Sequence, residues 1–363
     1  LLDTTQEGAE RGKAWSQGLL DAAVRKGRST PAKRDALLAL ITPTTDYAAL
    51  LGCDLVIEAV FEDRAVKAEV TAKAEAVIGT DAVFASNTST LPITGLARAS
   101  ARPEHFIGLH FFSPVDKMPL VEIIVGMETS DETLARGFDY VLQIGKTPIV
   151  VNDSRGFYTS RVFSTYVGEG LTLLAEGVAP ALIDNAGRMA GMPVGPLALA
   201  DEVSLELMAR IRRQTAADLG SAYQRSAIDE VCERMVDSAL GRLGKKAGKG
   251  FYEYPQGATK HLWAGLAELW KPAPVQPDAA EVKQRLLAIQ SIETVRCLEE
   301  GVLRAPIDAD VGAILGWGFP AYLGGPIGQI HSRGIAAFVA DCDELARRHG
   351  PRFRSHIGKA HDI

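Results

Sequence analysis

The sequence predicts an α/β protein in which a parallel-sheet domain is followed by two all-helical domains. Over residues 1–150, short apolar runs rich in β-branched residues alternate with helical patterns, which is typical of parallel strands joined by helices. After Gly156 the chain changes to long helices rich in Ala, Leu and Glu. One segment of this helical part recurs in similar form further along the chain, which indicates a duplication.

Five apolar runs predict the strands of the sheet, and helical patterns lie before and between them. The strand runs are DLVIEAV (54–60), AVFAS (82–86), HFIGLHFF (105–112), LVEIIVG (120–126) and PIVV (148–151). Helices are predicted over 7–24, 66–77 and 129–146. In the last of these, Ser130 or Thr129 is the N-cap and Gly145 ends the helix.

The chain opens with LLD (1–3), which predicts the end of a strand with an acid at its tip, followed by a helix. In a dinucleotide-binding unit, such an acid binds ribose hydroxyls and lies about twenty residues after a GxGxxG loop. No GxGxxG occurs in this sequence, because KAGKGFY (246–252) lacks both the spacing and the preceding strand. Asp3 is therefore either an ordinary surface residue or the ribose-binding acid of a domain whose first strand and glycine loop are missing here.

The helical part contains a proline-rich linker, KPAPVQPDAA (271–280), between two copies of a weak repeat. The segments that resemble each other are AEGVAPALID (175–184) and EEGVLRAPID (299–308), followed by GMPVGP (191–196) and GWGFPAYLGGP (316–326). Their agreement in order and spacing favours a duplicated helical domain. We expect domains at 1–152, 153–270 and 271–363, the first incomplete at its start and the last a degenerate copy of the second.

Charge and composition exclude several classes of protein. The 363 residues carry a net charge of -6, which argues against binding to nucleic acid or to an anionic membrane surface. The 4 cysteines form no CxxC pair and no cluster with histidine, which disfavours zinc sites and disulfide frameworks and indicates a reducing compartment. No apolar run approaches twenty residues, so no integral membrane segment is expected. These observations predict a soluble cytoplasmic protein.

The segment GLHFFSPVDKMPLVEII (108–124) places two ionisable residues, His110 and Glu122, among apolar residues that predict burial. A buried carboxylate is costly unless it is paired, and the simplest partner for Glu122 is His110. The alternative is that the backbone satisfies each group separately.

Two further segments stand out, and the first of them is predicted to lie where the ligands of open α/β sheets bind. SNTSTLPI (86–93) follows a predicted strand and puts Asn87, Thr88 and Ser89 at its carboxyl end. Such residues also form polar turns that cap helices without any ligand. VNDSRGFYTSR (151–161) joins the sheet to the first long helix.

In this order and spacing, the three segments resemble the 3-hydroxyacyl-CoA dehydrogenase family. A His-Phe-Phe-x-Pro segment with a glutamate twelve residues after the histidine, preceded by Ser-Asn-Thr-Ser, is specific to that family, and GKGFYEY (248–254) matches a motif near the end of its first helical domain. The continuation of the chain is similar to the α subunits of bacterial fatty-acid oxidation multienzyme complexes, which carry an enoyl-CoA hydratase/isomerase domain at the N-terminus. By this resemblance the chain is a fragment that begins just after the glycine loop, and we expect such a fragment to be inactive.

The resemblance implies a Rossmann-like first domain and NAD-dependent oxidation of (3S)-3-hydroxyacyl-CoA to 3-oxoacyl-CoA in fatty-acid β-oxidation, with a thiolase subunit as partner. The implied roles are catalysis for His110, Glu122 and Ser89, substrate binding for Ser160 and Ser113, and NAD binding for Asp3, Ala59, Glu62, Lys67 and Asn87. Imidazole suits the role of base because it exchanges protons near neutral pH. A carboxylate on its other nitrogen would fix the tautomer and stabilise the imidazolium.

Several alternatives stay open. Glu62 and Lys67 also suit a simple charge pair at a helix start. The family commonly has asparagine where this chain has Ser160 and Ser113, so a contact with substrate must be rearranged, bridged by water or lost. One competing function is another two-domain hydroxyacid dehydrogenase, such as a hydroxyisobutyrate type; these typically use a lysine base, which the pairing of His110 with Glu122 disfavours. Another is a non-catalytic scaffold of the multienzyme complex that binds no cofactor.

Overall fold

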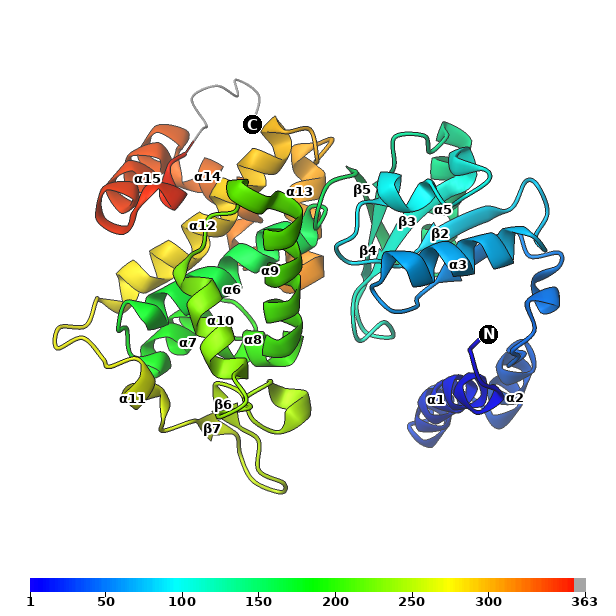
Figure 1. The fold of residues 1–363 in the computed structure, drawn as a ribbon, viewed down its shortest axis with the longest axis horizontal. Helices are drawn as coiled ribbons and strands as arrows, with labels where there is room; N and C mark the ends of the chain where they lie inside the picture. Colours follow the sequence, from blue (N-terminus) through cyan, green and yellow to red (C-terminus); the bar gives the residue numbers. More distant parts are fainter. Residues whose placement is uncertain (356–363) are drawn as a thin grey trace. The chain divides into compact units, whose positions relative to one another are not determined.

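The computed structural model describes residues 1–355, and its first half is built around one sheet (Figure 1). The strands of this sheet are β1 (Leu55–Glu58), β2 (Val83–Ser86), β3 (Phe106–Phe111), β4 (Leu120–Val125) and β5 (Thr147–Asn152), in the order β1-β2-β3-β4-β5. The pairs β1–β2, β2–β3 and β4–β5 are parallel. Each strand lies within or overlaps a predicted run, so the predicted fold class is confirmed.

The chain divides into two compact units. The first comprises Leu1–Leu109 and Gly126–Gly137, and the second comprises His110–Val125 together with the chain from Phe138 on. The carboxyl end of β3 and all of β4 therefore pack with the helical part of the protein. These two units are defined only by which residues pack against each other. The domain boundaries expected at 152 and 270 stay a prediction.

In the first unit, short polar side chains cap the N-termini of several helices. The helices here are α1 (Gln6–Arg25), α2 (Pro31–Ala39), η1 (Tyr47–Leu50), α3 (Arg64–Glu75), α4 (Ile93–Ala97), η2 (Pro103–His105) and the first part of α5 (Asp131–Gln143). Thr5 accepts a hydrogen bond from the backbone of α1, and Asp63 accepts two from that of α3. For α5 it is Ser130, one of the two predicted N-caps, whose hydroxyl accepts from the N–H of Thr133.

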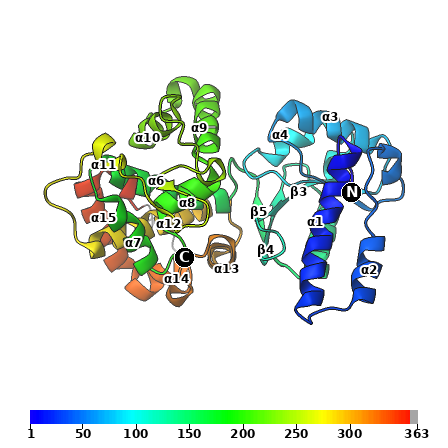
Figure 2. The same ribbon diagram turned by 90° about the horizontal axis from the view of Figure 1, so that it is seen from below.

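The start of the chain forms an isolated parallel bridge rather than a strand. Leu2 pairs with Thr44, and the N–H of Asp3 donates to the carbonyl of Thr44 at 3.2 Å. The helix predicted over 7–24 is α1, and it lies beside α2 (Figures 1 and 2).

The second unit is an assembly of helices centred on α6. Its helices are α6 (Thr159–Ala175), α7 (Pro180–Met189), α8 (Pro196–Val203), α9 (Leu205–Leu219), α10 (Ala227–Val236), α11 (Leu266–Leu269), α12 (Ala279–Glu299), α13 (Pro306–Trp317), α14 (Pro326–Arg333) and α15 (Ile335–His349). Helix α6 contacts α7, α8, α10, α12 and α13, which explains why its Leu171, Leu173 and Leu174 are fully buried. No helix of the described chain combines the length and the apolar character that crossing a membrane requires.

Short elements complete this unit. They are the 3₁₀ helices η3 (Gly220–Ala222), η4 (Lys245–Ala247), η5 (Ala321–Leu323) and η6 (Pro351–Phe353), and an antiparallel pair of β6 (Tyr252–Glu253) with β7 (His261–Leu262). The linker predicted over 271–280 overlaps α12, which begins at Ala279 with Asp278 as its N-cap.

The two copies of the predicted repeat use the same capping device. Asp184 of α7 accepts from the N–H of Leu197 at 2.8 Å, and Asp310 of α13 accepts from the N–H of Ile327 at 2.8 Å. In both copies the next helix begins with Gly-Pro, and a Cβ on that glycine would meet the aspartate within 2.4 Å in the first copy and 2.3 Å in the second. The two similar sequence segments end at Asp184 and Asp308, which predicts that these two residues correspond. The structure matches Asp184 with Asp310, because the connection before α13 is two residues longer.

Candidate active site

His110 and Glu122 lie in contact in the second unit. His110 is near the carboxyl end of β3, and Glu122 is in the middle of β4. The distance from His110 Nδ1 to Glu122 Oε2 is 2.9 Å. Glu122 is 0% exposed and His110 is 7% exposed. The partner suggested by the sequence is thus within hydrogen-bond distance.

Glu122 is also held by the N-terminus of α6. Its Oε1 accepts from the N–H groups of Tyr158 at 2.9 Å and Thr159 at 3.0 Å, and its Oε2 accepts from the Thr159 hydroxyl at 2.5 Å. Free N–H groups and the helix dipole at this end favour a negative charge. Glu122 therefore has both kinds of partner that the sequence left open, the imidazole and the backbone.

The chain just before α6 makes this contact possible by a tight turn. Gly156 has φ of 75° and Phe157 has φ of 51°, so two consecutive residues are left-handed. Both are buried, and the turn brings the following N–H groups onto Glu122. The part of VNDSRGFYTSR that contacts Glu122 is therefore the turn together with the first residues of the helix.

The imidazole of His110 has aromatic neighbours. The ring centroids of Phe112 and Phe157 lie 4.5 Å and 6.2 Å from that of His110. Apolar walls exclude water and strengthen the attraction between a carboxylate and an imidazolium. With Nδ1–H donated to Glu122, Nε2 is the nitrogen that can accept a proton.

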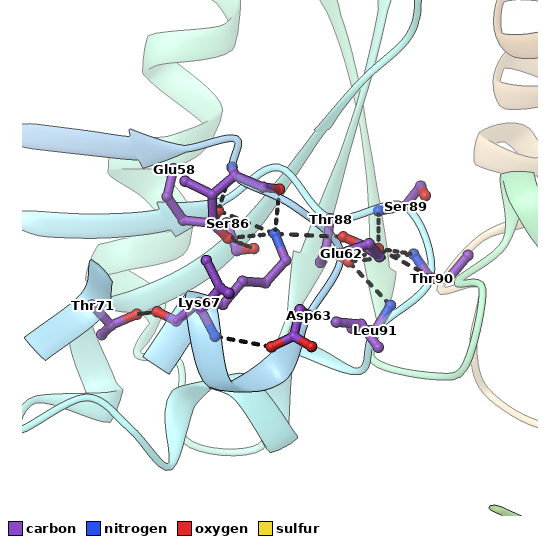
Figure 3. A network of polar contacts seen from close by, with 12 residues as sticks. Glu58, Glu62, Asp63, Lys67, Thr71, Ser86, Thr88, Ser89, Thr90 and Leu91 are labelled. Carbon is purple, nitrogen blue, oxygen red and sulfur yellow. Dashed lines mark hydrogen bonds and ion pairs between the residues drawn. The ribbon is translucent and has the colours of Figure 1, made fainter. Parts of the chain in front are cut away.

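In the first unit, Glu62 ties two loops together (Figure 3). Its carboxylate accepts from the hydroxyl of Thr88, from the N–H groups of Ser89 and Thr90 at 3.2 Å each, and from the Thr90 hydroxyl at 3.1 Å. Burial alone would raise the pKa of Glu62, but the hydrogen bond from Thr88 and the charge of Lys67 outweigh it and lower that pKa. The loop after β1 is thus fastened to the loop after β2.

Lys67 forms a buried ion pair in the same network (Figure 3). Its Nζ donates to Glu58 Oε1 and Oε2 at 3.0 and 3.1 Å, and lies 3.4 Å from Glu62 Oε2. The hydroxyl of Ser86 also donates to Glu58. The charge pair of Glu62 with Lys67, one of the two alternatives, is therefore present, and Lys67 itself is only 2% exposed.

Glu58 is the residue that sequence reasoning missed. It is the last residue of β1 and the acid that interrupts the apolar residues of the run DLVIEAV, between Ile57 and Ala59. The same signal, an acid where burial is predicted, singled out Glu122. Applied to the first strand, it predicts that Glu58 has a buried cationic partner.

The remaining expected site residues fall into two groups. In the first unit, Ala59 and Ser89 are exposed in the loops after β1 and β2, and Asn87 directly follows β2, its N–H donating to the carbonyl of Glu58 at 2.9 Å. In the second unit, Ser113 is exposed in the loop between β3 and β4, and Ser160 is half-buried next to Thr159.

The residues after the strands of the first unit fit a dinucleotide in part. Asp3 is exposed and packs against the first turn of α1, where a Cβ on Gly8 would lie 2.8 Å from its Cγ. An acceptor-only carboxylate before a helix suits ribose hydroxyls. Ala59 and Asn87 lie at the carboxyl ends of parallel strands, where such ligands bind. The GxGxxG loop that would receive the pyrophosphate does not occur in this sequence.

Comparison with models of known protein families shows the family to which the chain belongs. The model of the 3-hydroxyacyl-CoA dehydrogenase NAD binding domain matches residues 1–154, and that of the 3-hydroxyacyl-CoA dehydrogenase C-terminal domain matches residues 156–254. The family is one of oxidoreductases, and the matched first domain is its NAD binding domain. The chain belongs to the 3-hydroxyacyl-CoA dehydrogenase family, as the resemblance indicated.

Individual proteins of known name or structure are also similar to this chain. The chain is 42% identical over 361 residues to a fatty acid oxidation complex subunit alpha from Shewanella halifaxensis, covering 97% of this chain and 49% of the relative. It therefore spans about half the length of the curated relatives it matches. The solved structure of 3-hydroxybutyryl-CoA dehydrogenase from Escherichia coli K12 superposes with a TM-score of 0.82 at 26% identity, over 98% of this chain and 90% of that one. The structure of (S)-3-hydroxybutyryl-CoA dehydrogenase from Ralstonia eutropha superposes with a TM-score of 0.65 at 35% identity. This match covers 70% of this chain and 89% of that one.

Proposed function

We propose that the protein oxidises (3S)-3-hydroxyacyl-CoA to 3-oxoacyl-CoA in fatty-acid β-oxidation, with His110 as the general base. The observation that supports this most directly is the 2.9 Å contact between His110 Nδ1 and the buried Glu122. A carboxylate in this position fixes the tautomer in which Nε2 carries the lone pair.

In the proposed reaction, Nε2 of His110 takes the proton of the hydroxyl on carbon 3 of the substrate. NAD, when bound, accepts the hydride that leaves carbon 3. Glu122 then stabilises the imidazolium, and its position at the N-terminus of α6 keeps its own charge satisfied throughout. In the reverse direction, the same imidazolium returns the proton to the oxygen.

The other expected residues have supporting roles in this proposal. Asp3, Ala59, Glu62, Lys67 and Asn87 line the NAD site, Ser89 bonds the reacting oxygen or the nicotinamide side, and Ser113 and Ser160 contact the substrate. Lys67 supports the NAD site through Glu62, because its own side chain is buried and holds the loop that carries Glu62.

The names of the relatives support a further part of the proposal. Several are called subunits of a fatty acid oxidation complex. We propose that this protein likewise works in a complex, with a thiolase subunit as partner, in the cytoplasm.

The test is His110→Gln in the full-length protein. Turnover of 3-hydroxyacyl-CoA should fall by about 10²- to 10⁴-fold, the usual contribution of a positioned base. The affinity for acyl-CoA should change far less, because the proton moves only in the transition state. Equal losses in affinity and turnover would show that His110 is not the base.

A further inference from the structure

We infer that Thr159 is a positioning residue for the proposed base: its hydroxyl holds the same carboxylate oxygen that holds His110, and so sets how strongly Glu122 attracts the imidazolium. This inference rests on the proposed function of His110. The hydroxyl Oγ1 of Thr159 lies 2.5 Å from Glu122 Oε2, and His110 Nδ1 lies 2.9 Å from that atom.

The direction of the hydrogen bond follows from the chemistry of the partners. An ionised carboxylate only accepts, so the Thr159 hydroxyl must donate. Thr159 is 1% exposed, so water does not compete for this bond. Two donors therefore share Oε2, while the backbone N–H groups of Tyr158 and Thr159 occupy Oε1.

Sharing the oxygen weakens each of its interactions. A hydrogen bond to a carboxylate spreads and stabilises its negative charge, which leaves less attraction for a neighbouring imidazolium. Removing the hydroxyl should therefore favour the protonated form of His110. It should not free Glu122, because both backbone donors on Oε1 stay in place.

Other titratable groups near Glu122 are the same in every Thr159 variant. Tyr158 and Cys297 act on Glu122 electrostatically, with Asp310 and Arg161 beyond them. Burial raises the pKa of Cys297 to about 12 and that of Tyr158 well above its ordinary value. Neither changes charge between pH 5 and 9.

The experiment is the pH profile of kcat/KM for hydroxyacyl-CoA oxidation in the full-length protein. A base must be unprotonated, so activity falls on the acid side as His110 gains its proton. Thr159→Val keeps the shape and removes the hydroxyl, and its acid limb should move to higher pH by about 0.5 to 1 unit. Thr159→Ser keeps the hydroxyl and should restore the original limb. Thr159→Ala also removes the hydroxyl, and its acid limb should shift in the same direction, so it replaces the valine variant if that variant fails to fold.

A matched control lies on the same helix. The hydroxyl of Thr172 donates to the carbonyl of Gly168 within α6, so Thr172→Val makes the same chemical change away from Glu122. It should leave the profile as it is. The inference is overturned if the acid limb of the valine and alanine variants stays in place or moves to lower pH, or if the serine variant shifts as they do. His110→Gln separates this from the proposed function: if that variant keeps full turnover, the base assignment fails whatever Thr159 does.

Discussion

Lys67 and Glu58 form an ion pair in which Nζ lies 3.0 and 3.1 Å from the two carboxylate oxygens, and both side chains are 2% exposed. Glu58 ends β1, while Lys67 lies one turn into α3. The pair therefore ties a strand of the sheet to the helix that follows it, and its lysine also reaches Glu62 in the loop between them.

Breaking this pair should be strongly destabilising. Glu58→Gln removes one charge and leaves the other buried, which lowers the free energy of unfolding by about 3 kcal/mol. Urea unfolding of the variant measures this. Glu69→Gln is the control, because Glu69 pairs with Lys73 on the exposed face of the same helix, where solvent screens the two charges, so its effect on stability should be far smaller. A loss for Glu58→Gln as small as that of the control would contradict the prediction.

The double variant separates pairing from burial. If Glu58 and Lys67 act on each other, then Glu58→Gln with Lys67→Met should cost less than the sum of the two single changes, by about 1 kcal/mol or more. The unfolding curves of the unchanged protein, the two single variants and the double variant give this coupling energy. Strict additivity would show that the two side chains stabilise the sheet independently.

Glu62 should matter for NADH affinity through the loop it holds. Glu62→Gln keeps the size of the side chain but removes its negative charge, which weakens the hydrogen bonds that Oε1 accepts from Thr88 and Thr90. With the amide oxygen at the position of Oε1, the NH₂ group replaces Oε2 and faces Lys67 Nζ, so two donors meet there. The loop that carries Ser89 should loosen, and the Kd for NADH should rise about tenfold, which is about 1.4 kcal/mol. Calorimetric titration of the full-length protein checks this, with Glu69→Gln again as control. An unchanged Kd would separate this loop from the cofactor site.

Ser160 tests the contact with substrate. Ser160→Asn introduces the residue common in the family, and the longer amide can reach a substrate directly, so activity should be kept or rise. Steady-state kinetics with hydroxyacyl-CoA give the answer. A loss of more than about tenfold in turnover, about 1.4 kcal/mol, would show that the surroundings of α6 are shaped around serine.

Because of Asp201, the free energy of unfolding should decrease as pH rises through the range in which this carboxyl group ionises. Burial raises the pKa of Asp201 to about 6, although the backbone N–H groups of Tyr252 and Phe251 hydrogen-bond to it. The folded state therefore prefers the protonated form, while the unfolded chain ionises near pH 4. The resulting destabilisation develops as pH rises from about 4 to 6 and is complete above that. The stability of the protein relative to Asp201→Asn should increase as pH falls from 7.5 to 5, measured by urea unfolding. A constant difference between the two would contradict the raised pKa.

Local patterns in the sequence were sufficient for most of the elements. Strands and helices follow from the spacing of apolar residues and from caps such as Ser130, which depend only on near neighbours in the chain. The pairing of His110 with Glu122 could also be expected, because two ionisable groups in adjacent apolar strands have few other partners. The sequence motif GKGFYEY was identified by resemblance alone, which gives no physical reason for its second glycine, Gly250. The structure supplies one, since a Cβ on Gly250 would lie 1.9 Å from Asp201 Oδ1.

Only the tertiary structure decided which distant groups share a partner. The sequence offered Lys67 as a ligand of NAD or a partner of Glu62, and gave no sign that it contacts Glu58, the residue that ends the preceding strand. It likewise showed Ser160 as the unusual residue of its motif, whereas the neighbouring Thr159 reaches Glu122 from 37 residues away. Periodicity records which face of an element is buried. Which residue lies across that buried face depends on how the elements pack in space. A shift of one residue along a helix or strand points a different side chain at the neighbouring element, and so changes the partner.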